Sequence, residues 1–221
     1  MWTSTRTIPS PYDEIADFKN GVFHFSFSRS LNWLESLGKK YFGPHFRIYQ
    51  EDRGLLFSLL VYADGDKETA AGCGIDLGKG ILLTGPVGTG KTTLMTLVNL
   101  FFPKDQQYQI KPAREIGFEF EQQGYKTITK YSQELSRPNI FCFDDLGIEQ
   151  PQKYFGNQCN VMAEILLSRY DLFVSRGILT HATTNLSATE LESKYGNRVR
   201  SRMREMFNLV AFDKNSCDKR S

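Results

Sequence analysis

Residues 85–92 read GPVGTGKT, and this stretch constrains the fold more than any other part of the 221-residue chain. It matches the pattern G-x-x-x-x-G-K-[ST], with an apolar run, Ile81–Thr84, before it and a helical pattern, Thr92–Phe102, after it. Glycines allow backbone N–H groups to close around phosphates, and the N-terminus of the following helix adds partial positive charge. We therefore predict a strand, a phosphate-binding loop and a helix, and not a chance glycine-rich turn.

The residues of this loop supply the predicted contacts with a nucleotide. Lys91 is expected to reach the outer phosphates, and the hydroxyl of Thr92 is expected to ligate Mg²⁺. The other predicted nucleotide-binding residues are Gly85, Pro86, Val87, Gly88, Thr89, Gly90 and Thr93.

A second motif, IFCFDDLG, occupies residues 140–147. Its apolar residues predict a buried strand, and two carboxylates follow at the C-terminal end, where α/β sheets place their ligands. We expect Asp144 to hold Mg²⁺ through water, and Asp145 to orient or deprotonate an attacking water. The alternative is a solvated turn, which the phosphate loop upstream disfavours.

A third candidate is the TTN sequence of residues 183–185, which closes a predicted strand that begins at Ile178. A polar residue at this strand tip is suited to positioning a water or a γ-phosphate, and Asn185 is the candidate. The competing interpretation is a helix start, since Ser187 and Glu190 have the spacing of a capping box. Both interpretations are compatible, because the cap would fix the turn that presents Asn185.

From Gly74 onward, short apolar runs alternate with helical patterns. The strand-like runs are Ile81–Leu83, Tyr108–Ile110, Ile140–Phe143, Ile178–Thr184 and Leu209–Phe212. This alternation predicts an α/β fold over residues 74–221, with a parallel sheet flanked by crossover helices. Residues 1–73 carry no nucleotide motif and predict a small, mostly helical region, with helices around Ser30–Phe42 and after Asp52. Its role stays open between a structural cap and a partner-docking module.

Residues 198–204 read RVRSRMR and form a basic helix. At helical spacing three apolar residues face inward: Val199, Met203 and Met206. Arginine binds phosphate through a planar, bidentate geometry. One of the arginines of this helix is therefore a candidate arginine finger for a neighbouring subunit. Contact with a nucleic-acid backbone and a merely solvated helix are the alternatives.

The region between residues 104 and 131 interleaves basic and aromatic side chains. The basic ones are Lys104, Lys111, Arg114, Lys126 and Lys130, and the aromatic ones are Phe118, Phe120, Tyr125 and Tyr131. This is the pattern of single-stranded nucleic acid binding. The spacing of Ile116 and Phe120 equally indicates the buried face of a crossover helix. Arg169, in a helix predicted over residues 160–174, is a candidate for an intersubunit or phosphate contact.

The composition excludes several other classes. With 40% hydrophobic and 24% charged residues and a net charge of +2, the chain is neither disordered nor coated in positive charge. Its four cysteines form no CxxC pair, which disfavours a metal site or a disulfide framework and favours reduced thiols. The N-terminus lacks the apolar segment of a secretory signal, and no apolar run reaches the ~18 residues of a membrane span. We therefore expect a cytoplasmic protein with no membrane partner.

Four segments, GPVGTGKTT, FCFDDLG, THATTNLS and YGNRVRSRM, together resemble the small AAA+ ATPases of the bacterial DnaC/IstB type. These are replicative-helicase loaders and the ATPase helpers of insertion-sequence transposases. The resemblance covers residues 74–220 and implies an AAA+-like P-loop NTPase fold. Because the sequence stops at Ser221, we expect no C-terminal helical lid.

By this resemblance Lys91 and Thr92 bind ATP and Mg²⁺, Asp144 and Asp145 form the acidic motif, and Asn185 is similar to the family's first sensor. The implied activity is Mg²⁺-dependent ATP hydrolysis, used as a switch in DNA replication or in transposition.

Arg202, or else Arg198, matches the region that carries the family's arginine finger, and Arg220 lies in a basic segment where a second sensor is expected. The implied partners are further copies of the chain, single-stranded DNA, and a helicase or a transposase. Two other functions stay open, a small-molecule kinase and a nucleotide-binding scaffold that does not hydrolyse. The paired aspartates favour water as the acceptor and thus disfavour both.

Overall fold

The computed structural model describes residues 2–4, 14–19, 22–132, 139–154 and 157–219. The chain divides into two compact units, residues 1–77 with 93–105, and residues 78–92 with 106–221. They are called the N-terminal unit and the sheet unit below, and each is described by itself. The division into domains at residues 73 and 74 stays a prediction.

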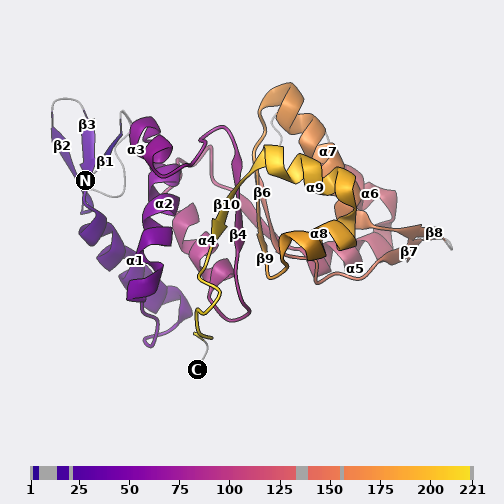
Figure 1. Cartoon of the computed structure of the whole chain (residues 1–221), viewed down its shortest axis with the longest axis horizontal. Helices are drawn as coiled ribbons and strands as arrows, with labels where there is room; N and C mark the ends of the chain where they lie inside the picture. Colours follow the sequence, from indigo (N-terminus) through magenta and orange to yellow (C-terminus); the bar gives the residue numbers. More distant parts are fainter. Residues whose placement is uncertain (1, 5–13, 20–21, 133–138, 155–156, 220–221) are drawn as a thin grey trace. The chain divides into compact units, whose positions relative to one another are not determined.

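The N-terminal unit combines helices with a small antiparallel sheet (Figure 1). The strands are β1 (Trp2–Ser4), β2 (Ala16–Lys19) and β3 (Val22–Phe25), in the order β1-β3-β2. The helices are α1 (Phe27–Phe42), α2 (Arg53–Asp64) and α3 (Lys67–Gly72), with a 3-10 turn, η1 (Gln50–Asp52), before α2. The two longer helices confirm the sequence prediction, and the three strands were not predicted.

Leucines at helical spacing build the core of this unit, and Leu34, Leu56 and Leu60 are completely buried. Helix α4 (Lys91–Asn99) starts in the sheet unit, and its residues from Thr93 onward belong to the N-terminal unit. Beyond α4, the Phe101 ring meets Trp33 edge-on, with the ring centroids 5.1 Å apart. Large aromatic contacts of this kind add to the burial energy of a small core.

Five parallel strands form the centre of the sheet unit, in the order β10-β4-β9-β6-β5. They are β4 (Gly80–Thr84), β5 (Gln109–Pro112), β6 (Phe141–Leu146), β9 (Thr180–Thr184) and β10 (Phe207–Ala211). Each overlaps a run predicted from the sequence, so the parallel α/β fold is confirmed. Because β9 lies between β4 and β6, the C-terminal ends of these three strands are adjacent at one edge of the sheet.

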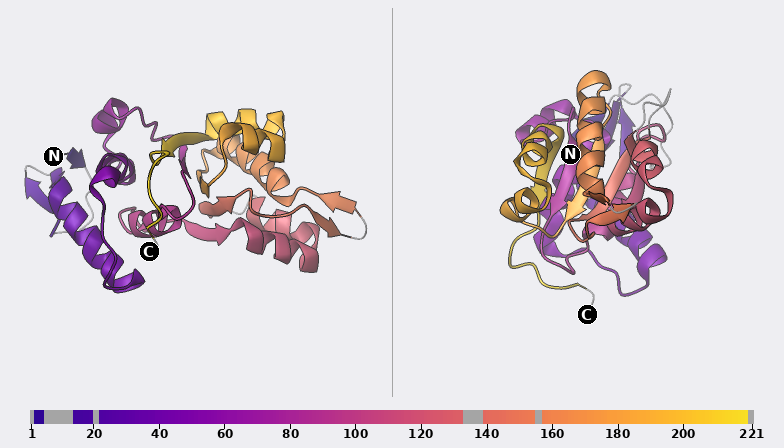
Figure 2. Two further views of the ribbon diagram at one scale, coloured as in Figure 1. Left: turned by 60° about the horizontal axis from the view of Figure 1, so that its bottom comes forward. Right: turned by 90° about the vertical axis from the view of Figure 1, so that its right-hand side faces the viewer.

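Helices α5 to α9 gather against one face of this sheet (Figure 1). They are α5 (Ala113–Gln123), α6 (Tyr125–Ser132), α7 (Val161–Arg176), α8 (Ala188–Tyr195) and α9 (Asn197–Met206). Their apolar faces share a core with Phe143 and Ala182 of the strands. A hairpin of β7 (Gln152–Tyr154) and β8 (Asn157–Cys159), which was not predicted, projects past α5 (Figure 2). No helix in the described part of the chain is long and apolar enough to cross a membrane.

Arg169 of α7 is the largest fully buried side chain that the structure describes, so the prediction of an intersubunit or phosphate contact for it is wrong. Its guanidinium donates hydrogen bonds to the Thr180 hydroxyl at 2.8 Å and to the carbonyls of Asn139 at 3.1 Å and Leu179 at 2.7 Å. Burial lowers the pKa of Arg169 to about 10. The residue ties α7 to the start of β9.

Candidate nucleotide site

The predicted phosphate loop joins β4 to α4, and the order strand, loop, helix is confirmed. Gly88 and Gly90 have φ angles of 84° and 86°, a left-handed backbone that residues with a Cβ rarely adopt. These two glycines let the loop fold back so that α4 begins directly at Lys91. Backbone N–H groups at the start of a helix are suited to binding phosphate.

Two side chains of the loop are held against its own backbone. The Thr89 hydroxyl donates to the Pro86 carbonyl at 3.0 Å. The ammonium of Lys91, which is 5% exposed, donates to the carbonyls of Gly85 at 2.9 Å and Pro86 at 2.8 Å. Lys91 is therefore ordered at the loop, while Val87 is largely exposed.

Asp144, at the end of β6, joins three motifs that are far apart in the sequence. The Thr92 hydroxyl donates to its carboxylate at 2.9 and 3.0 Å, and the Thr183 hydroxyl donates to it at 2.6 Å. Burial raises the pKa of Asp144, the two hydroxyls oppose this rise, and the negative charge of Asp145 adds to it. A buried carboxylate with a raised pKa gains from a nearby cation, so Asp144 is suited to a divalent metal.

Asp145 is the one described residue other than glycine with a positive φ angle, 53°. Its backbone N–H donates to the Thr183 hydroxyl at 2.8 Å, which holds this conformation. Its carboxylate accepts a hydrogen bond from the exposed Asn185 amide at 3.4 Å. Backbone strain of this kind clusters at functional sites in proteins. The structure thus brings together the predicted residues Asp144, Asp145 and Asn185.

Thr183 belongs to the TTN candidate, in which the sequence analysis gave a role to Asn185 alone. The signal was present, since a central parallel strand buried on both faces normally reads as an apolar run, whereas β9 reads THATT. The neighbouring Thr184 hydroxyl donates to the Leu146 carbonyl at 2.7 Å and so fixes β9 to β6. The predicted capping box of Ser187 and Glu190 is present and starts α8.

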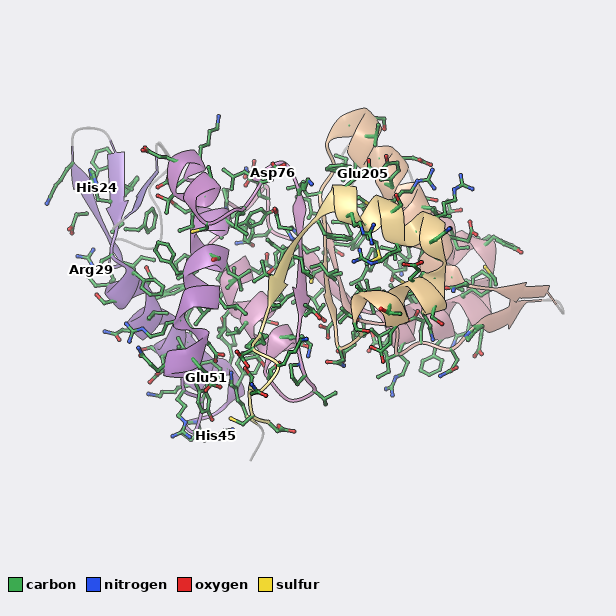
Figure 3. The ribbon with its side chains drawn as sticks, in the orientation of Figure 1. His24, Arg29, His45, Glu51, Asp76 and Glu205 are labelled. Atoms are coloured by element: carbon green, nitrogen blue, oxygen red, sulfur yellow. The ribbon has the colours of Figure 1, made fainter. Side chains whose placement is uncertain are left out.

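Helix α9 carries its arginines around a shallow hollow of about 630 Å³. The three residues predicted to face inward are buried, which confirms the helical pattern. Arg198 is exposed, whereas Arg202 is half-buried with its guanidinium 4.9 Å from the centre of the Tyr170 ring. The Tyr170 hydroxyl donates to Glu205, which Figure 3 labels on α9, at 2.7 Å.

The topology places Arg202 away from the phosphate loop of its own chain. Helix α9 runs directly into β10, whose first residue, Phe207, pairs with Gly80 at the start of β4. The loop follows the opposite end of β4. Arg202 precedes Phe207 by little more than one helical turn, so it lies toward the far edge of the sheet.

The predicted basic and aromatic surface is only partly present. Phe120 and Tyr131 are buried, so their prediction as stacking residues is wrong. Ile116 is buried with Phe120, so the crossover-helix interpretation holds for these two residues. Phe118 and Tyr125 are 49% and 56% exposed, and the Arg114 guanidinium lies 5.8 Å from the centre of the Phe118 ring.

Of the other basic residues, Lys130 pairs with Glu119 at 2.8 Å, and Lys126 is exposed. Lys111 lies on β5, and Lys104 belongs to the N-terminal unit. Arg220 lies outside the described residues.

No family model matches the sequence, and no curated protein matches it. Among solved structures, the chain is similar to the DnaC helicase loader, with 19% identity over 75% of this chain and 92% of that one and a TM-score of 0.53. The chain has the DnaC-type AAA+ fold. A protein described as a primosome component from Streptococcus pyogenes serotype M3 shares this DnaC-type fold, at 16% identity over 76% of this chain and 83% of that one, also with a TM-score of 0.53.

A replication initiator, DnaA bound to AMPPCP and single-stranded DNA, matches 78% of this chain and 49% of its own at 17% identity, with a TM-score of 0.50. The AAA+ fold expected from the motifs is therefore confirmed.

Proposed function

We propose that the chain binds ATP with Mg²⁺, hydrolyses it, and uses the turnover as a switch in loading a replicative helicase. The observation that carries the proposal is the hydrogen-bonded set of Thr92, Asp144 and Thr183, which unites the phosphate loop with two other strand ends. The similarity to a helicase loader, which covers 92% of that protein's chain, favours a role in replication over one in transposition.

The side chains present fit an Mg²⁺-bound nucleotide. Lys91 and the backbone N–H groups at the start of α4 supply positive charge for the phosphates. The Thr92 hydroxyl and the Asp144 carboxylate, 2.9 Å apart, offer the oxygen ligands that Mg²⁺ prefers. When bound, Mg²⁺ neutralises charge that develops on the transferred phosphoryl group.

The remaining chemistry belongs to the side chains of this chain. Asp145 accepts a proton from the attacking water, and the Asn185 amide orients the Asp145 carboxylate. Thr183 fixes both aspartates, because its hydroxyl bonds the side chain of Asp144 and the backbone of Asp145. Such fixed geometry is what positions a water for in-line attack.

The proposal extends to a site shared between copies of the chain. Arg202 lies toward the sheet edge opposite its own loop, which supports a role at a neighbour's ATP and not at its own. Arg198, one helical turn before Arg202 on α9 and exposed, is the second candidate for this role. An arginine supplied in trans stabilises the charge of the transition state.

We also propose contact with single-stranded DNA through the exposed Phe118 and Tyr125, with Arg114 and Lys126 beside them in the sequence. Aromatic faces stack on bases, and basic groups follow the backbone. Replacing Phe118 and Tyr125 by alanine should weaken the binding of an oligothymidylate, measured by fluorescence anisotropy. Equal affinity of the variant and the wild type would remove this surface from the proposal.

The direct test is ATP binding and phosphate release by the full chain, with and without Mg²⁺ and with no added acceptor. Lys91→Ala should abolish tight ATP binding, since it removes the ammonium that the loop supplies. Unchanged affinity in that variant would contradict the assignment of the loop. ATP binding with no phosphate release would instead favour a kinase or a scaffold.

A further inference from the structure

Residues 212–219, called the strap here, follow β10 and lie across the phosphate loop. Because β10 and β4 are parallel, the strap leaves the sheet at the edge where the loop begins (Figure 1). At the start of the strap, the Phe212 N–H donates to the Thr84 carbonyl at 2.9 Å. A Cβ added to Gly85 would overlap the Phe212 side chain, so the strap touches the loop at its first residue.

The far end of the strap touches the loop again. The Lys219 N–H donates to the Gly88 carbonyl at 2.9 Å. A Cβ added to Gly88 would overlap the carboxylate of Asp218, so that carboxylate rests directly on the Gly88 backbone. Gly88 and the neighbouring Thr89 are buried, although they belong to a loop.

The negative charge of Asp218 is unfavourable for phosphate binding at this position. The loop is built to receive phosphates, with Lys91 and the start of α4 supplying positive charge. A carboxylate against Gly88 opposes the approach of a polyanion, and like charges a few ångströms apart interact strongly near a protein surface. The position of Asp218 therefore bears on nucleotide affinity.

Most of the strap is exposed. Residues 213–215, 217 and 218 are exposed. A local turn, in which the Ser216 N–H donates to the Asp213 carbonyl at 3.0 Å, shapes the middle of the strap. The Lys219 ammonium lies 4.9 Å from the centre of the Phe212 ring and closes the strap on itself. This exposed segment separates Asp218 from β10, so displacing the Asp218 end does not require β10 to unpair from the sheet.

We propose that Asp218 sets the ATP affinity of the loop, and that binding of ATP displaces the Asp218 end of the strap from Gly88. This inference rests on the proposed function, because it requires that ATP binds at the loop. The strap thus competes with ATP for the loop of its own chain, and the strength of this competition depends on the charge of the Asp218 carboxylate.

The test compares the dissociation constant of MgATP for the full chain with that of two single variants. Asp218→Asn keeps the size of the side chain and removes its charge. Asp213→Asn removes a charge from the same strap at a residue for which the structure describes no contact with the loop. The asparagine keeps the side-chain oxygen that accepts the Asn215 N–H. Asp218→Asn should tighten ATP binding about three- to tenfold, an advantage that shrinks at high salt. Asp213→Asn should match the wild type.

Hydrogen exchange supplies the second measurement. The Lys219 amide should be protected without nucleotide and lose its protection when ATP saturates the wild type. Unchanged protection overturns the displacement, and equal affinities of Asp218→Asn and wild type overturn the role of Asp218. Equal gains in both variants overturn it too, because the effect is then one of net charge. If the wild type binds no ATP, the proposed function falls with the strap, whereas ATP binding without an Asp218 effect removes the strap alone.

Discussion

Thr183 donates its hydroxyl hydrogen to Asp144 over 2.6 Å, and the same oxygen accepts the N–H of the next residue, Asp145, over 2.8 Å. One side chain of β9 thus fixes the carboxylate of Asp144 and the backbone of Asp145, two neighbouring residues of β6. It also explains how Asp145 is kept at a φ angle of 53°, since the hydrogen bond binds its backbone N–H directly.

Thr183→Val is therefore expected to disturb the site more than the loss of a hydroxyl that makes a single hydrogen bond. It leaves the buried Asp144 with one donor fewer and the Asp145 N–H without an acceptor. We expect a loss of about 1–3 kcal/mol in the free energy of unfolding, measured in urea, and a weaker Mg²⁺ dependence of turnover. Thr183→Ser, which keeps the hydroxyl, is the control. A valine variant as stable and active as the serine variant would contradict this role.

His181 gives the sheet unit a predictable response to acid. Its Nδ1 accepts the Ile81 N–H at 3.1 Å, and burial, with Arg169 nearby, lowers its pKa to about 3. The folded state therefore resists protonation of His181. The contribution of this residue to the free energy of unfolding is fully present above pH 6.5 and decreases as the pH falls below that value. The expected slope is about 1.4 kcal/mol per pH unit from this residue.

The measurement is urea unfolding of wild type and His181→Gln between neutral and mildly acidic pH. Glutamine keeps an acceptor for the Ile81 N–H and does not titrate, so its stability should fall less steeply with acid. Parallel curves for the two proteins would show that His181 does not titrate on unfolding.

Arg169 should behave as a structural residue. Arg169→Ala removes three hydrogen bonds and leaves a cavity, so we expect a loss of about 2–5 kcal/mol in the free energy of unfolding. Arg176→Ala, at the exposed end of the same helix, is the control. Stability like that of the wild type, combined with a change in oligomer size on a sizing column, would restore the intersubunit interpretation.

Much of the fold was predictable because the signals are local. The apolar run before GPVGTGKT, the paired aspartates after IFCF and the capping box at Ser187 each depend on neighbours in the sequence, and the structure contains all three. The strands β2 and β3 carried a signal that was not used, since Asn20 and Gly21, which separate them in the sequence, are a common hairpin pair.

The rest depended on contacts that no local pattern encodes. The positive φ angle of Asp145 results from a hydrogen bond to Thr183, far along the chain. Asp218 and Gly88 are likewise far apart in the sequence, and the strap has no periodicity to reveal their contact. The burial of Arg169 was missed because a charged residue on an apolar helix more often reaches the surface.

The shared-site proposal predicts complementation between two inactive variants. Arg202→Ala should bind ATP normally and lose most of its turnover, because fingers supplied in trans contribute about 10³–10⁵-fold in P-loop enzymes. Lys91→Ala lacks tight ATP binding and keeps Arg202. Mixing the two should restore part of the phosphate release, and wild-type turnover should rise faster than linearly with protein concentration. Strictly linear activity with no rescue on mixing would leave Arg202 as a residue that only packs on Tyr170.

The central claim is that the chain hydrolyses ATP with Asp145 as the base, and one comparison tests it most directly. ATP binding and Mg²⁺-dependent phosphate release are measured side by side for the wild type and Asp145→Asn, an isosteric change that removes the proton acceptor. The account predicts unchanged ATP affinity and a fall in turnover of roughly 10²–10⁴-fold. Equal phosphate release by the two proteins, or none from the wild type at any concentration, would contradict it.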